Sequence, residues 1–100
     1  MKLFDIIAEL TFFTYSGMVQ VIYDKETSAT EISELFRALP GVTTVTIAGQ
    51  DASERKITMK IKLISQKPGT EAFEAMKANA LSKYQRVSTV IIANNTIEKK

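Results

Sequence analysis

The fold is decided by the stretch Leu35-Phe36-Arg37-Ala38-Leu39-Pro40-Gly41-Val42-Thr43-Thr44-Val45-Thr46-Ile47-Ala48-Gly49, in which a helical pattern gives way to a strand. Pro40 lacks the amide hydrogen that a helix interior needs, and Gly41 accepts the left-handed backbone with which many helices end. The β-branched residues that follow predict a strand over 42–48, with Val42, Val45 and Ile47 facing the core.

A near copy of this strand returns close to the C-terminus, where residues 87–93 read Val-Ser-Thr-Val-Ile-Ile-Ala. The preceding elements match as well, because residues 19–21 align with 59–61 and residues 30–38 align with 70–78 at an offset of 40. The second helix has five extra residues, so the two strands align at an offset of 45. This likeness would result from a duplication, or from two halves that must meet the same packing requirements.

Each half of the chain therefore reads as strand, helix, strand. Two such halves in series predict a ferredoxin-like βαββαβ sandwich of the α+β class. Its antiparallel four-stranded sheet carries both helices on one face and has the first and third strands at its centre. We expect strands at 18–23, 42–48, 56–63 and 87–93, and helices at 29–39 and 71–84.

Capping and periodicity support the two helices. Ser28-Ala29-Thr30-Glu31 is a capping-box pattern, and it predicts that the first helix begins at about Ala29. Thr70 is the candidate N-cap of the second helix. The helix residues expected in the core are Ile32, Leu35, Phe36, Leu39, Phe73, Met76, Ala80 and either Leu81 or Tyr84.

The first 16 residues are predicted to form an apolar arm outside this domain. Residues 3–10 have the apolar spacing of a short amphipathic helix, and residues 10–15 read as a loop or an extra strand. The arm either packs on its own domain or offers Phe4, Ile7, Phe12 and Phe13 to a partner. We expect the ferredoxin-like domain to span 17–94 and a flexible tail to span 95–100.

Composition restricts the chemistry. The chain has 100 residues, 45% of them hydrophobic, and a net charge of +2, as expected for one small domain without a strong polyanion-binding field. It has no cysteine and no histidine, which removes thiolate chemistry, the commonest general base and the commonest transition-metal ligand. We therefore expect a non-enzymatic protein without metal or cofactor. No secretory or membrane segment is recognisable, so we also expect a cytoplasmic location.

The helix-free face of the predicted sheet is where a binding function is expected. Alternation assigns to it Gln20, Ile22, Thr44, Thr46, Thr58, Lys60, Lys62, Thr89 and Ile91. An RNA-recognition domain of this topology would stack bases on aromatic residues of its central strands. Thr58, Lys60 and Lys62 stand at those positions of the third strand, which leaves only weak attraction of lysines to a nucleic-acid backbone.

Three resemblances bear on function. The run Leu35-x-x-Leu39-Pro40-Gly41-Val42-x-x-Val45-x-Ile47 resembles heavy-metal-associated domains and ACT-type regulatory domains. The first family needs paired cysteines in the loop after its first strand, and residues 24–28 have none. The second implies a small-ligand sensor that dimerises side by side, although the glycine typical of that loop is missing. The amphipathic start, Gly-Val-Thr-Thr-Val at 41–45, Gly-Thr-Glu-Ala-Phe at 69–73 and Thr-Ile-Glu-Lys-Lys at 96–100 carry the third resemblance. Over most of its length the chain resembles short uncharacterised proteins of marine tailed bacteriophages, which implies a phage origin.

These observations favour a small non-enzymatic module that acts by self-association or by docking on a protein, as a phage structural or accessory component in the host cytoplasm or the virion. Its candidate interface residues are Phe4, Ile7, Phe12, Phe13, Thr44, Thr46 and Ile91. An ACT-like ligand sensor is one alternative. A weak nucleic-acid binder is the other, with Gln20, Thr58, Lys60 and Lys62 as its open-face polar residues.

Overall fold

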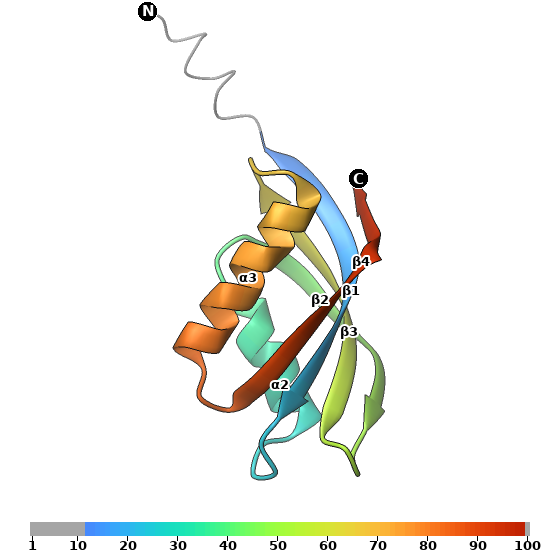
Figure 1. Ribbon diagram of the computed structural model, residues 1–100, viewed down its shortest axis with the longest axis vertical. Helices are drawn as coiled ribbons and strands as arrows, with labels where there is room; N and C mark the ends of the chain where they lie inside the picture. Colours follow the sequence, from blue (N-terminus) through green and yellow to red (C-terminus); the bar gives the residue numbers. More distant parts are fainter. Residues whose placement is uncertain (1–11, 100) are drawn as a thin grey trace, which may run out of the picture.

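The chain folds as an antiparallel sheet with two helices on one side (Figure 1). The computed structural model describes residues 12–99. Its elements are β1 (Phe13–Tyr23), α2 (Ala29–Arg37), β2 (Val42–Asp51), β3 (Lys56–Ser65), α3 (Gly69–Lys83) and β4 (Val87–Lys99). The strand order is β2-β3-β1-β4, so the predicted ferredoxin-like βαββαβ arrangement is confirmed, with β1 and β3 at the centre.

Local signals at both ends of α2 behave as the sequence predicts. The Ser28 hydroxyl accepts a hydrogen bond from the Glu31 amide at 3.2 Å, and the Ser28 amide donates to the Glu31 carboxylate at 3.3 Å. Gly41 ends the turn after the helix with a φ of 85°, and a Cβ there would lie 3.0 Å from the Ile64 carbonyl oxygen. Only glycine fits this position without strain.

The start of α3 differs from the prediction. Pro68, not Thr70, is the N-cap, and its carbonyl accepts the Ala72 amide at 2.8 Å without any side-chain cap. Proline already fixes the φ needed to enter the helix there, so the helix begins at Gly69. Of the two open choices for the end of the buried stripe, Tyr84 packs against the core, whereas Leu81 is 40% exposed.

The core lies between the sheet and the helices. The central strands contribute side chains that are fully buried, as strict alternation predicts: Val19, Val21, Ile57, Met59 and Ile61. Phe36 and Phe73 cover them from the two helices. Burying each such side chain stabilises the fold by about 1.5 to 3 kcal/mol.

Ile47 is an error in the predicted core. It lies across the ladder from Met59, on the helix side of the sheet, yet 39% of it is exposed, whereas Val45 is buried. Because β2 is an edge strand, its outer flank has no neighbouring strand to cover a side chain.

The first and the last strand, β1 and β4, are both longer than predicted. Residues 13–16, assigned to the arm, pair with β3, because Gly17 does not interrupt β1. Residues 94–99, assigned mainly to the tail, belong to β4, where Glu98 and Lys99 pair with Ser16 and Tyr15. The predicted arm helix over 3–10, with Phe4 and Ile7, lies outside the described residues.

A large irregular bulge explains how β4 continues past its predicted end. Residues 94–97 stand opposite the single residue Gly17. The Thr96 hydroxyl accepts from the Met18 amide at 2.8 Å and donates to the Ala93 carbonyl at 2.6 Å. The Ile97 side chain packs against Gly17: a Cβ built on Gly17 would lie 3.0 Å from Ile97 Cγ1 and 3.1 Å from the Phe73 ring. The bulge therefore turns an apolar side chain into the end of the core.

The internal repeat extends to the backbone irregularities. One extra residue, Thr43, bulges where β2 meets β3, and its sequence counterpart Ser88 bulges where β4 meets β1. The hydrogen bonds before the bulges also correspond, from the Ile64 amide to Gly41 at 2.8 Å and from the Asp24 amide to Arg86 at 3.0 Å. The β2–β3 and β4–β1 pairs are thus two copies of one local structure.

The described residues include no helix long and apolar enough to cross a bilayer.

Candidate functional site

The pairing register brings the predicted open-face residues together on the side of the sheet that has no helix. Gln20 lies between Thr58 and Ile91, Lys60 lies opposite Thr46, and Lys62 lies opposite Thr44. Among these residues Thr44, Thr46, Lys60 and Ile91 are exposed, and Gln20, Thr58 and Lys62 are half-buried. Ile91 is the most exposed large apolar residue within this group, at 46%.

The centre of this face has no platform for stacked bases. Residues of the two central strands that point to it include Met18, Gln20, Thr58, Lys60 and Lys62. None of these five is aromatic, whereas RNA-binding sheets of this topology place aromatic rings there. The side chains on this face are mainly threonine and isoleucine, with two lysines at its centre.

The edges of the sheet present a second kind of surface, made of backbone groups. Along a strand, successive residues direct their N–H and C=O groups to opposite sides. The Ile64 amide points to β2, so Lys62 and Lys60 point there too, and their partners Thr44 and Thr46 point inward. Val45 and Ile47 therefore direct their backbone groups away from the sheet.

The same alternation locates the outward groups of β4. The Met18 and Asp24 amides both bond to residues on the β4 side, so Gln20 between them faces β4 as well. Its partner Ile91 points inward, and the outward N–H and C=O groups are those of Val90 and Ile92. Both side chains face the core, Val90 with 2% exposure and Ile92 half-buried.

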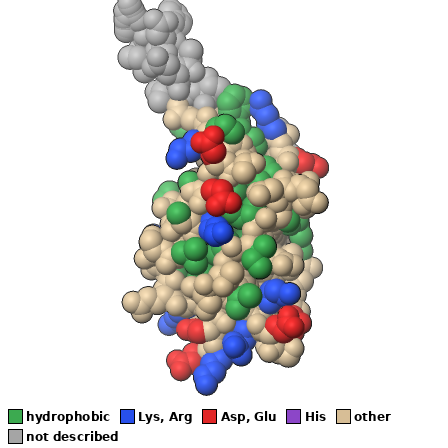
Figure 2. All heavy atoms as spheres, in the orientation of Figure 1, with side chains coloured by type: hydrophobic (Ala, Val, Ile, Leu, Met, Phe, Trp, Pro, Cys, Tyr) green, Lys and Arg blue, Asp and Glu red, His purple; other side chains and the backbone are tan. Residues whose placement is uncertain are grey.

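Charge is absent from both edges over most of their length. Residues 42–50 of β2 and 87–97 of β4 contain no Asp, Glu, Lys, Arg or Pro. Native edge strands usually carry such residues, because a charge or a proline prevents another strand from pairing. Charged side chains gather instead at the lower end of the molecule in Figure 2, where the β1–α2 and β2–β3 connections lie.

On one of the two edges, an outward backbone group already has a partner from a helix. Arg37, the last residue of α2, donates from Nη2 to the Val45 carbonyl at 3.2 Å. This carbonyl is one of the outward groups of β2. Lys77 of α3 aligns with Arg37 in the repeat, and Val90 aligns with Val45. Within residues 12–99 no side chain donates to the Val90 carbonyl, so the outward groups of β4 are open.

The aromatic residues next to the arm divide between surface and core. Phe12 is 57% exposed. Phe13 belongs to β1, packs against the core and lies 4.0 Å below the Lys99 ammonium, measured to the ring centroid. Phe12 is therefore available to a partner, and Phe13 is largely committed to the domain.

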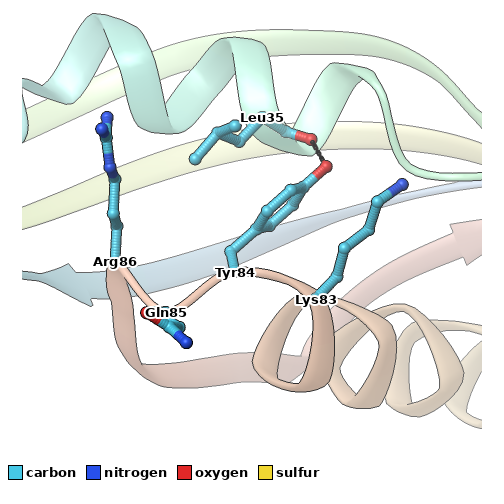
Figure 3. A pocket seen from close by; sticks show the side chains of 5 residues that line it. All are labelled: Leu35, Lys83, Tyr84, Gln85 and Arg86. Atoms are coloured by element: carbon cyan, nitrogen blue, oxygen red, sulfur yellow. Dashed lines mark hydrogen bonds between the residues drawn. The ribbon is translucent and has the colours of Figure 1, made fainter.

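A shallow cavity of about 330 Å³ lies between α2 and the connection from α3 to β4. Figure 3 shows Tyr84 reaching across it to α2, with Lys83 and Arg86 on either side. The Tyr84 hydroxyl donates to the Leu35 carbonyl at 2.7 Å, and burial raises the pKa of this phenol. Arg86 forms an ion pair with Glu31 at 2.7 Å.

Ionisable groups elsewhere have structural roles. Hydrogen bonds from the Ser53 hydroxyl and the Glu54 amide lower the pKa of Asp51, which closes the β2–β3 turn. Residues 12–99 contain no cluster of three or more metal-ligating side chains.

No protein-family model matches the chain, and no curated protein matches it.

Two elements of these sites were not identified from the sequence. The contact of Arg37 with the β2 edge was missed, although its place at the end of the first repeat helix, where the second repeat has Lys77, was a usable signal. Tyr84 is predicted as a candidate core residue of the second helix, but not as a link between the two halves. Both contacts join residues whose proximity depends on how the helices pack.

Proposed function

We propose that this chain is a non-enzymatic assembly module that works by self-association through the margins of its sheet. The observation that carries the proposal is the pair of uncharged edges, over 42–50 and 87–97, in a protein whose open face also exposes Ile91 at 46%. Such edges pair readily with further strands, since backbone groups supply the affinity.

The resemblance to short phage proteins suggests a setting for this activity. A structural or accessory component of a virion acts through repeated contacts between identical copies, and a small domain with pairing-competent edges suits that role. The setting would then be the host cytoplasm or the particle itself.

The test is the mass of the full chain in solution as a function of concentration. Sedimentation equilibrium or light scattering should show a mass above that of one chain, which rises with concentration. A mass equal to one chain at every concentration up to the millimolar range would contradict the proposal. A chain that lacks residues 1–11 separates the arm from the domain, because it leaves all of β1 intact.

A second candidate function is supported by the cavity around Tyr84. Its two cations, Lys83 and Arg86, flank an aromatic ring and suit a small molecule with a carboxylate and an apolar part, which would share Arg86 with Glu31. This is the ligand class that an ACT-like sensor would take. Such a ligand would raise the unfolding temperature, by the equivalent of about 2.7 kcal/mol at a concentration 100 times its Kd.

The matching experiment is a thermal-shift screen with the 20 amino acids and a set of simple carboxylates. A shift that the Arg86→Gln variant loses and the Lys77→Gln variant keeps would support this function. Absence of any shift across the screen would exclude these probes as ligands.

A further inference from the structure

The regular part of β4 forms the more accessible edge. Residues 89–93 pair with 18–22 without a register shift, and within them Val90 and Ile92 direct their backbone groups outward. The regular part of β2 covers only 44–47 between its bulges, and there Arg37 holds the Val45 carbonyl. A fifth strand is therefore more easily added at β4 than at β2.

We propose that two copies of this chain pair antiparallel through β4, with the two-fold axis at Ile91. The proposal rests on self-association as the function and names its interface. In this register Val90 pairs with the partner's Ile92, and Ile92 pairs with the partner's Val90. Both outward N–H and C=O groups of each strand are then satisfied, and an eight-stranded sheet with β4 at its centre results.

The side chains of β4 suit a second copy. A residue on the axis of an antiparallel pair lies directly opposite itself, so the exposed Ile91 would pack on the partner's Ile91. Thr89 would lie opposite the partner's Ala93 on the same face. No charge enters the pairing, because residues 87–97 are uncharged, and like charges therefore do not oppose self-pairing.

The register also fits the irregularities of β4. The bulges at Ser88 and at 94–97 bound the five residues that the pairing uses. A pairing centred elsewhere would push one strand into a bulge of the other. Centring on Ile91, the middle of residues 89–93, keeps the paired segments of both copies within the regular part.

The chain has no cysteine, which makes a single introduced thiol a direct probe. Opposite residues of a pair that is not hydrogen-bonded have Cα atoms about 4.5 Å apart, within the range that a disulfide requires. The Ile91→Cys variant should therefore form a covalent dimer under mild oxidation. Thr46→Cys is the matched control, since Thr46 aligns with Ile91 in the repeat and is also exposed on the open face, on β2.

Each outcome separates this interface from the proposed function. A rapid disulfide with Ile91→Cys, at least ten times faster than with Thr46→Cys, supports the β4 pairing. Comparable slow rates for both variants, in a protein whose unmodified chain is an oligomer, would overturn the interface and leave self-association standing. Faster linkage through Thr46→Cys would place the contact at β2 and also overturn it. A monomeric chain with no linkage would overturn both.

Discussion

β2 and β4 are two versions of one edge strand, and the difference between them lies in a neighbouring helix. Their sequences begin Val-Thr-Thr-Val and Val-Ser-Thr-Val, and each bulges at its second residue. On β2 the Arg37 guanidinium holds the Val45 carbonyl at 3.2 Å, whereas Val90 of β4 has no such donor among the described residues. An edge can thus be protected from outside the strand.

Arginine and lysine are not equivalent in this role. Guanidinium presents five donors in a rigid, planar fork, so it can hold a carbonyl in a fixed geometry. Lys77 aligns with Arg37 but carries a compact ammonium on a flexible stem. The two halves of the repeat therefore differ in a way that leaves more outward backbone groups free on β4 than on β2 among the described residues.

Removal of the Arg37 guanidinium is expected to have the largest effect. In Arg37→Met the stem remains but the Val45 carbonyl is released, so both edges of each copy become open. Copies with two open edges form sheets that do not close. Light scattering should show particles far larger than the wild-type oligomer at the same concentration.

Lys77→Met is the matched control for that change, because Lys77 aligns with Arg37 in the repeat although it lies in the middle of α3. It should leave the mass of the oligomer unchanged. Equal masses for Arg37→Met and the wild type would show that the guanidinium does not protect β2.

The second bulge of β4 is expected to stabilise the domain. Ile97→Ala removes a half-buried side chain that packs against the positions of Gly17 and Gly69. The loss should be about 1 to 2 kcal/mol, below the range for fully buried isoleucines. Urea denaturation at fixed protein concentration measures it.

Ile64→Ala is the control for this prediction, because Ile64 is 42% exposed and its truncation should change stability by less than about 0.5 kcal/mol. If both variants lost the same stability, the end of β4 would have no part in the core.

Loss of the Tyr84–Leu35 hydrogen bond, which links the two halves of the chain, is expected to have the smallest effect on stability. Tyr84→Phe removes the hydrogen bond to the Leu35 carbonyl, which costs about 0.5 to 1 kcal/mol because the Ala38 amide still donates to that carbonyl. Thermal unfolding near neutral pH measures the loss.

The pH dependence gives an independent measure of the same residue. Burial raises the pKa of Tyr84 above its ordinary value of 10.0, so the folded state keeps the phenol proton longer than the unfolded state. The corresponding stability is complete below pH 10 and is lost as the pH rises through the raised pKa. Tyr84→Phe should show less destabilisation than the wild type above pH 10. Parallel curves would contradict this role.

The fold was predictable because its signals are local. Strict alternation over 56–63, the capping box at Ser28 and the stop at Pro40 and Gly41 each depend on neighbouring residues. The ends of β1 and β4 were not predictable in the same way. Gly17 reads as a break in the sequence, but the space beside it is filled by Ile97, which is 80 residues away in the chain.

The candidate site was predictable only in part, for the same reason. Alternation placed Gln20, Lys60 and Ile91 on one face, and the register agrees. The difference between the edges required tertiary information, because Arg37 binds an outward carbonyl of β2 through the way α2 packs on the sheet. Ile47 was misplaced because edge position, rather than sequence pattern, decides its exposure.

Amide hydrogen exchange, resolved by residue with NMR over a range of protein concentrations, tests the central claim most directly. The outward amides of Val90 and Ile92 should become more protected as concentration rises, while the outward amide of Ile47 on β2 stays unprotected. Exchange of all three amides at similar rates that do not depend on concentration would contradict assembly through β4.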